Sequence, residues 1–394
     1  MKTLVLGLLP VTGKDFINRT TEIDDILRAL KDPGIRVGYA ISAPVGTGKT
    51  SLLQELARRL ALEQRIVPIY FSLQSLSDVT LEHFVKRFTI AVLQASESRL
   101  KLRHDAKDLM ESPLTILDKL LRDAKISDEL RQAIILLVTF EREKTIDKHG
   151  LVEAAVDLPE MIAKETDSRC VLLLDEFTLL ADLKSTNERF EFDIFSLIRS
   201  MHEKHRHCVL VITSSNQKAL DTITLSPDAP FHHQFVLKHL KNLSREAATQ
   251  LYEKNLDKRI DAAALKAIFD FTQGSPFYLQ FLGRMLKSAA TPNITEDIAK
   301  NAIEEFLQQE GEMIFREKVK QLSAKERLIL SCMAQHDVKT PSEIGKIMNY
   351  SQTNVRRFLA ILEEKGVLVN TSRGVFVFED TIFKRWLAAK GVDA

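Results

Sequence analysis

Two glycines, a lysine and a threonine stand close together between an apolar run and a helical pattern. Glycines allow consecutive backbone N–H groups to turn toward one anion, and the N-terminus of the following helix adds a partial positive charge. Lys49 can reach the β- and γ-phosphates of a nucleoside triphosphate, and Thr50 can ligate Mg²⁺. The pattern predicts a phosphate-binding loop, in which Ala43 replaces the usual first glycine. The loop consists of Ala43, Pro44, Val45, Gly46, Thr47, Gly48, Lys49, Thr50 and Ser51.

Four apolar residues, Val171 to Leu174, run directly into two acids, Asp175 and Glu176. A buried strand can carry carboxylates only where it ends, because there they meet water, a metal or a ligand. We expect Asp175 to hold Mg²⁺, largely through its water molecules, and Glu176 to polarise the water that attacks the γ-phosphate. A nucleotide kinase or small-molecule kinase does not need a second acid for this purpose. With the loop, the acid pair predicts hydrolysis of a nucleoside triphosphate.

Polar residues also follow a second apolar run, Cys208–Thr213. If that run is a strand of the same sheet, Ser214 and Asn216 lie beside the acid pair and can orient the attacking water. We expect one of these two residues, rather than Thr213, to sense the γ-phosphate. A plain hydroxyl-rich turn explains the same residues equally well.

Two further segments are predicted to contact the nucleotide. Phe16, Ile17 and Arg19 precede the first strand and can fold over the base. Gly274-Ser-Pro276 interrupts a helical region, and Pro276 suits the first turn of the next helix. This element has two interpretations. It is either a simple helix break, or it places lid helices over the nucleotide. The sequence has no Asn-Lys-x-Asp motif for reading guanine, which favours adenine.

The elements that must position these residues alternate between short apolar runs and helical patterns. Strands are predicted at Val37–Ser42, Arg65–Leu73, Cys170–Leu174, Cys208–Thr213 and, more weakly, Gln234–Leu240. Helices are predicted at Thr50–Leu62, Leu81–Ala95, Leu151–Glu165 and Phe190–His205. Such alternation builds a parallel sheet covered by helices, which binds ligands at the carboxyl ends of its strands. Pro68 suggests that the second strand is an edge strand. The predicted fold class is α/β, of the P-loop NTPase type.

The same patterns divide the chain into three predicted domains. Residues 1–240 form the P-loop NTPase domain, residues 241–310 a helical lid, and residues 311–394 a winged helix. A charged amphipathic stretch at about 97–149 is expected to be a helical insertion in the first domain, with leucines at helical spacing at Leu114, Leu117, Leu120 and Leu121. The winged helix is predicted from helices at Ser323–Gln335, from Thr340 and at Gln352–Lys365, followed by short strands at Val367–Val369 and Val375–Phe378.

Composition and charge exclude several classes of protein. The 394 residues are 45% hydrophobic and 28% charged, which is typical of a compact protein rather than a disordered one. The net charge of +1 provides no overall field toward nucleic acids or membranes. No apolar stretch approaches the roughly 18 residues of a membrane-spanning helix, so we expect no membrane partner and a cytoplasmic location.

The cysteines and histidines are interpreted as structural. Cys170 and Cys208 each open an apolar run and are expected to pack as small hydrophobes, while Cys332 lies far from both. The absence of a paired spacing fits a reducing compartment. The histidine clusters lack acidic or thiol partners at ligand spacing in the sequence, so no metal site is predicted there. These clusters are His202, His205 and His207, and the pair His232 and His233.

Taken in order, the motifs resemble one family. They are Phe16-x-x-Arg19-x-x-Glu22, the phosphate loop, the acid pair, Thr213-Ser-Ser215, Leu240-x-x-Leu243-Ser, Gly274-Ser-Pro276 and the terminal Phe378-Glu-Asp-x-x-Phe-x-x-Trp386. This series resembles the archaeal-type ATPases of the STAND branch of the AAA+ superclass, and is similar to origin-recognition-type initiator ATPases. The chain departs from the family at Thr213, where the usual residue is glycine. The resemblance implies ATP or ADP and Mg²⁺ as ligands, with the bound nucleotide controlling the lid and the winged helix.

The predicted winged helix has two candidate partners, DNA and protein. From residue 322 onward the chain has eleven Lys or Arg and eight Asp or Glu, and a net of +3 is modest for a DNA reader. Glu363 and Glu364 close the predicted recognition helix. Polar residues able to contact bases or phosphates lie on that helix and at the wing tip, at Gln352, Asn354, Arg356, Arg357 and Arg373. DNA binding, docking of a partner protein and self-assembly all stay open.

Three functions fit these patterns. The first is a slow, Mg²⁺-dependent ATPase that acts as a molecular switch. The second is an initiator-like or transposition-helper ATPase that binds duplex DNA through the winged helix. The third is a nucleotide-binding protein without useful turnover. We favour the first, because the Gly274-Ser-Pro276 element and the winged helix indicate that turnover resets a switch rather than driving steady work.

Overall fold

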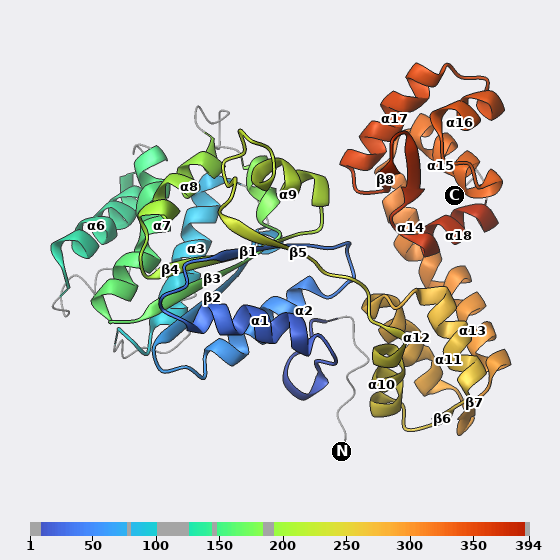
Figure 1. Ribbon diagram of the computed structural model, residues 1–394, viewed down its shortest axis with the longest axis horizontal. Coiled ribbons are helices and arrows are strands. Elements are labelled where there is room, and N and C mark those ends of the chain that lie inside the picture. Colours follow the sequence, from blue (N-terminus) through green and yellow to red (C-terminus); the bar gives the residue numbers. More distant parts are fainter. Residues whose placement is uncertain (1–8, 77–79, 101–125, 144–147, 184–192, 391–394) are drawn as a thin grey trace. The chain divides into compact units, whose positions relative to one another are not determined.

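The chain divides into two compact units (Figure 1). A computed structural model describes residues 9–76, 80–100, 126–143, 148–183 and 193–390. The sheet unit comprises Pro10–Ala43 and Lys49–Leu240. The C-terminal unit comprises Lys241–Ala394 together with Pro44–Gly48, the tip of the predicted phosphate loop.

The core of the sheet unit is a five-stranded parallel sheet in the order β2-β3-β4-β1-β5. Its strands are β1 (Gly38–Ser42), β2 (Ile66–Ser72), β3 (Arg169–Asp175), β4 (Cys208–Ser214) and β5 (Phe235–His239). The predicted α/β class and all five predicted strands are confirmed, and Pro68 lies in an edge strand as expected. β3 and β4 are buried along nearly their whole length because helices cover both faces.

Helices pack on both faces of this sheet, and the pleat decides which strand residues each face receives. α1 and α2 cover one face, where they bury Val171, Leu173, Val209 and Val211. α3, α7 and α8 cover the other face, where alternate residues such as Leu172 are buried. The helices of this unit are α1 (Thr20–Lys31), α2 (Lys49–Leu60), α3 (Leu81–Ser96), α6 (Asp128–Glu143), α7 (Lys148–Glu165), α8 (Ile194–Lys204) and α9 (Gln217–Thr224). Short 3₁₀ turns lie at Gly13–Asp15, Leu73–Ser75 and Phe177–Asp182.

The predicted helical insertion is described in part. α6 packs against α7 and buries Leu130, Ile134 and Leu137 in the same core as the sheet. Residues 101–125, which include the four leucines predicted at helical spacing, lie outside the described residues. The described part of the stretch thus extends the core on the face covered by α7.

The C-terminal unit is mostly helical (Figure 1). Its first helices are α10 (Arg245–Asn255), α11 (Ala262–Thr272), α12 (Pro276–Ser288), α13 (Glu296–Gln308) and α14 (Glu310–Lys320), with short parallel strands β6 (Arg259–Ile260) and β7 (Asn293–Ile294). The elements that follow are α15 (Ala324–His336), α16 (Pro341–Met348), α17 (Gln352–Glu364), the antiparallel pair β8 (Leu368–Ser372) and β9 (Val375–Phe378), and α18 (Thr381–Lys390). We call α15 to α18 the C-terminal segment; its elements follow the order expected for a winged helix. In the part of the chain that the structure describes, no helix is both long enough and apolar enough to cross a membrane.

Glu55 of α2 fastens the segment before α1 to the sheet unit. Its side chain is fully buried and accepts hydrogen bonds from the backbone N–H of Gly13, at 2.7 Å, and from Arg58 and Arg59. Burial alone would raise the pKa of Glu55, but these donors outweigh it and lower the pKa from 4.5 to about 2. The carboxylate therefore stabilises the fold above pH 4.5, and this contribution is lost as the pH falls toward 2.

We expect Glu55→Gln to remove most of this pH dependence. A shift of this size corresponds to roughly 3 kcal/mol of unfolding free energy, since one pKa unit is about 1.4 kcal/mol. Urea unfolding between pH 7 and pH 3 should show a larger free energy of unfolding for the wild type than for the variant, and this difference should shrink as the pH falls. Glu63→Gln is the control, because Glu63 forms a half-exposed ion pair with Lys31. A stability difference that stays constant with pH would contradict this role.

Candidate active site

The predicted phosphate loop connects the buried strand β1 to the N-terminus of α2. Gly46 and Gly48 have positive φ angles of 82° and 96°, which side chains with a Cβ rarely adopt. Thr47 donates its backbone N–H to the carbonyl oxygen of Pro44 at 3.3 Å, closing a turn at the tip. This backbone, followed directly by a helix N-terminus, is the arrangement in which N–H groups bind phosphate oxygens.

Lys49, the first residue of α2, is buried, with 5% of its side chain exposed. Its ammonium group donates to the carbonyl oxygen of Ala43 at 2.8 Å and lies 3.3 Å from a carboxylate oxygen of Glu176. The cation is thus held at the base of the loop, beside the end of β3. A phosphate bound in the loop would lie within reach of this charge.

Asp175 ends β3 and is 1% exposed. Its Oδ2 accepts hydrogen bonds from the Thr50 hydroxyl at 2.7 Å and the Tyr70 hydroxyl at 3.2 Å, and its Oδ1 accepts one from Thr213 at 2.6 Å. Burial and the neighbouring carboxylate raise the pKa of Tyr70 to about 12, which keeps it a hydroxyl donor at neutral pH. The adjacent carboxylate and hydroxyl oxygens of Asp175 and Thr50 are hard donors that fit Mg²⁺, and these two residues would hold it.

Glu176 follows in a left-handed conformation, with a φ of 55°. Its backbone N–H donates to the hydroxyl oxygen of Thr213 at 3.2 Å. Its Oε2 accepts from the backbone N–H and the hydroxyl of Ser215, at 2.7 and 2.8 Å, while Oε1 faces Lys49. A non-glycine residue in this conformation is unfavourable by about 1–3 kcal/mol unless its surroundings hold it, and such residues concentrate at functional sites.

The structure brings Thr213 and Ser215 to the acid pair. The sequence favours Ser214 and Asn216 over Thr213 as the sensor and does not single out Ser215. The hydroxyl of Ser214 is bonded instead to Thr178, at 2.7 Å, and to the backbone of Asn216. The side chain of Asn216 caps α9 by accepting the backbone N–H of Ala219. Strand register places Thr213 there, because it follows Ile212, the residue paired with Leu174.

The N-terminal candidates lie on the α1–α2 side of the sheet unit. Phe16 packs against the core of that face, and Ile17 is partly buried. Arg19 precedes α1 with a φ of 62° and is 6% exposed; burial lowers its pKa to about 10, although Glu22 opposes the shift. Ser51 accepts a hydrogen bond from the backbone N–H of Val11 at 3.1 Å, so the segment before α1 adjoins the start of α2.

Pro276 belongs to the C-terminal unit, as does the tip of the loop. It is the first residue of α12, as predicted. The next residue, Phe277, donates its backbone N–H to the carbonyl oxygen of Gly46 at 3.2 Å. The interrupted helical region therefore adjoins the tip of the phosphate loop, Pro44–Gly48.

Thr213→Val is expected to lower the turnover number for ATP by about ten- to a hundredfold. The substitution removes the donor to Asp175 and the acceptor for the N–H of Glu176, and a hydrogen bond to a charged group contributes about 1.5–3 kcal/mol. Steady-state phosphate release at saturating MgATP measures the effect. Thr213→Ser, which keeps the hydroxyl, is the matched control. Equal rates for the valine and serine variants would show that the hydroxyl is not needed.

Comparison with known proteins identifies the family. Residues 16–282 match the family described as an ATPase domain predominantly from Archaea. An uncharacterized ATP-binding protein of Methanocaldococcus jannaschii is 22% identical over 301 residues, covering 72% of this chain and 78% of that protein.

Solved structures show the same fold over the whole length. A Walker-type ATPase of Pyrococcus abyssi superimposes with a TM-score of 0.66 at 15% identity, covering 97% of this chain and 99% of that one. The ORC2 protein of Aeropyrum pernix, solved in ADPNP–ADP complexes, gives a TM-score of 0.55 at 15% identity, covering 96% and 97%. The family match, which spans the phosphate loop, the acid pair and Pro276, shows that the chain belongs to the archaeal ATPase-domain family and is an ATP-binding P-loop ATPase.

Proposed function

We propose that this ATPase is a slow, Mg²⁺-dependent molecular switch. In this proposal ATP and ADP set the position of a lid, residues 241–310, and of a winged helix, residues 311–394. Hydrolysis at Glu176 resets the switch. Ser214 and Asn216 remain proposed sensors of the γ-phosphate, together with Thr213, and Phe16, Ile17 and Arg19 remain proposed contacts of the base.

The observation that carries the proposal is the contact between the loop tip and α12. Besides the hydrogen bond from Phe277 to Gly46, a Cβ built on Gly46 would lie 2.9 Å from the Cβ of Phe277. Any movement of the loop backbone when phosphate binds or leaves must therefore be accommodated by the first turn of α12. The break before α12 is held as tightly, because the carbonyl oxygen of Gly274 accepts the N–H of Leu243 at 2.9 Å.

The same turn of α12 also contacts the C-terminal segment. The Tyr278 hydroxyl donates to Asp380 at 2.5 Å, and Asp380 caps α18 by accepting the N–H groups of Ile382 and Phe383. Arg385 of α18 lies over the ring of Phe271, 5.5 Å from its centroid. Adjacent residues thus contact the phosphate loop and the end of the chain, which supports coupling between them.

Tyr278→Phe tests this coupling, because it removes one hydroxyl and little volume. Hydrogen exchange in α18 and the β8–β9 pair should differ between the ADP-bound and the ATP-analogue-bound wild-type protein. The difference should be lost in the variant, while nucleotide affinity is retained. Tyr252→Phe is the control, because the Tyr252 hydroxyl donates to the carbonyl of Leu279 within the same helical region. Identical exchange in the two nucleotide states of the wild type would refute the switch.

A DNA-binding initiator-like or transposition-helper ATPase is the second candidate. Gln352, Asn354, Arg356 and Arg357 are exposed on α17, and Arg373 is exposed at the turn between β8 and β9. Within the described ranges, no carboxylate forms a salt bridge with any of these three arginines. Unpaired arginines on an exposed helix are suited to phosphate contacts.

Duplex binding at several salt concentrations separates the two candidates. If DNA binds, Arg356→Ala and Arg357→Ala should each weaken affinity and reduce the slope of log K against log salt by about 1. Arg316→Ala is the control, since Arg316 is paired with Glu312 on α14. Absence of duplex binding at low salt would eliminate the second candidate and leave the switch proposal unaffected.

A further inference from the structure

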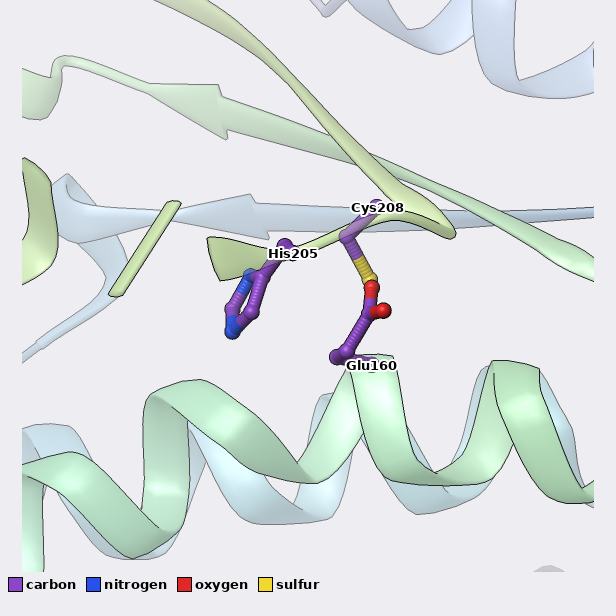
Figure 2. A group of neighbouring side chains, drawn as sticks. All are labelled: Glu160, His205 and Cys208. Atoms are coloured by element: carbon purple, nitrogen blue, oxygen red, sulfur yellow. The ribbon is translucent and has the colours of Figure 1, made fainter. Parts of the chain in front are cut away.

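A cluster of metal-ligand side chains lies outside the nucleotide site (Figure 2). The sequence predicted histidines without acidic or thiol partners, and this prediction is wrong for His205. Helix α7 brings Glu160 and the start of β4 brings Cys208 to His205, which directly follows α8. One ligand atom from each of the three residues lies within 4.8 Å of the other two. Cys208 lies only three positions after His205, so local spacing could have indicated that pair, whereas Glu160 lies 45 positions before His205 and could not be found in this way.

We propose that Glu160, His205 and Cys208 form a binding site for a divalent transition-metal ion of the zinc class. A thiolate, an imidazole and a carboxylate are the donors that Zn²⁺ takes in proteins, with a fourth position left for another ligand. The sulfur and nitrogen donors exclude Mg²⁺ and Ca²⁺, which select oxygen. Figure 2 shows the thiol of Cys208 and the carboxylate of Glu160 pointing toward each other, with the imidazole ring of His205 beside them.

Burial and charge favour such an ion. His205 is 7% exposed and Cys208 4% exposed, so an ion bound there would be largely removed from bulk water. A thiolate and a carboxylate together carry two negative charges, which a divalent cation would balance. Buried charges are tolerated when they are paired or coordinate a metal.

The surroundings hold the donors as those of metal sites do. Asp157 contacts Nε2 of His205 at 2.6 Å, and a metal-bound histidine usually has its other ring nitrogen held by a carboxylate. Glu160 is fixed by the backbone N–H groups of Arg206 and His207. The rings of His202 and His205 lie edge to face, with centroids 6.4 Å apart. Nδ1 of His202 is buried without a hydrogen-bond partner among the described residues.

The position of the cluster indicates a structural role. Cys208 begins β4, whereas Thr213 and the acid pair lie at the carboxyl ends of the strands. A metal ion at Cys208 would join α7 and the end of α8 to the sheet without touching the nucleotide. The inference is therefore independent of the proposed switch.

Cobalt(II) absorption tests the site directly. The nucleotide-free protein, stripped with a chelator and kept in excess Mg²⁺, is titrated with Co²⁺. We expect saturable binding with thiolate-to-cobalt charge transfer and displacement of Co²⁺ by Zn²⁺. The charge-transfer band should be lost in Cys208→Ser and kept in Cys332→Ser, since Cys332 lies in α15. Folded wild-type protein without saturable Co²⁺ binding, or a band that persists in Cys208→Ser, would overturn the proposal.

A second variant keeps the test decisive if Cys208→Ser does not fold. Asp157 is 37% exposed at its side chain, and Asp157→Asn leaves all three donors in place. Competition with a chromophoric chelator should show Zn²⁺ bound about ten- to a hundredfold more weakly by this variant. Lys49→Met should leave Zn²⁺ affinity unchanged. Unchanged affinity in Asp157→Asn, or a loss in Lys49→Met, would count against a metal site at His205.

Discussion

Glu176→Gln will lower the turnover number for ATP by about a hundred- to ten-thousandfold, the range by which a positioned general base accelerates a reaction. Glutamine keeps the size of the side chain and can still accept the hydrogen bonds of Ser215, at 2.7 and 2.8 Å in the wild type. It cannot take a proton from water. ATP binding should therefore persist, because the phosphate loop and Thr50 are unchanged.

Two measurements separate binding from chemistry in this variant. Titration with a fluorescent ATP analogue reports affinity, and single-turnover phosphate release reports the chemical step. Asp182→Asn is the matched control, since it changes an exposed carboxylate six residues further along the same segment. If Glu176→Gln hydrolyses ATP at the wild-type rate, Glu176 is not the base.

The loop and the acid pair could be predicted from the sequence because their signals are local. In the segment Ala43–Thr50, glycine spacing, an apolar run before it and a helical pattern after it all lie within one short stretch. The same holds for Val171–Glu176. Apolar runs of this length indicate buried parallel strands, and the parallel sheet follows from their alternation with helices.

The partners of the acids could not be predicted in the same way, because they depend on strand register. Leu174 pairs with Ile212, so Thr213 lies beside Asp175. Successive side chains alternate across a strand. Thr213 and Ser215 therefore face the acids, while Ser214 points to Thr178 on the other side. A shift of one residue would exchange these roles, and no pattern within either strand determines the register.

Tertiary packing also determined the contacts of Glu55 and His205. Glu55 bonds the N–H of Gly13, 42 residues away, and His205 bonds Asp157, 48 residues away. The carboxylates of Glu55 and Asp157 lie on helices whose apolar faces the sequence predicts. Which polar residue then meets each of them depends on how α2 and α7 lie on the sheet, and hydrophobic periodicity does not specify this.

Lys49→Met will weaken ATP binding by about a hundredfold or more, since truncating one partner of a buried charge pair costs about 2–5 kcal/mol. It will also destabilise the protein. Lys49 and Glu176 lie 3.3 Å apart with 5% and 7% of their side chains exposed, so the variant leaves a buried carboxylate without its cation. The expected loss of unfolding free energy is about 3 kcal/mol. Lys164→Met, which removes the exposed partner of Glu129, should cost less than about 1 kcal/mol.

The double variant Lys49→Met/Glu176→Gln separates the two roles of the lysine. Replacing Glu176 removes the uncompensated charge, so urea unfolding should show the double variant recovering most of the stability that Lys49→Met loses. ATP affinity should not recover, because the cation that contacts the phosphates is still absent. A double variant as unstable as Lys49→Met would mean that Lys49 stabilises the site by packing and its bond to Ala43 rather than by charge. Recovery of stability without recovery of binding would place the charge of Lys49 in two separate interactions, one with Glu176 and one with the nucleotide.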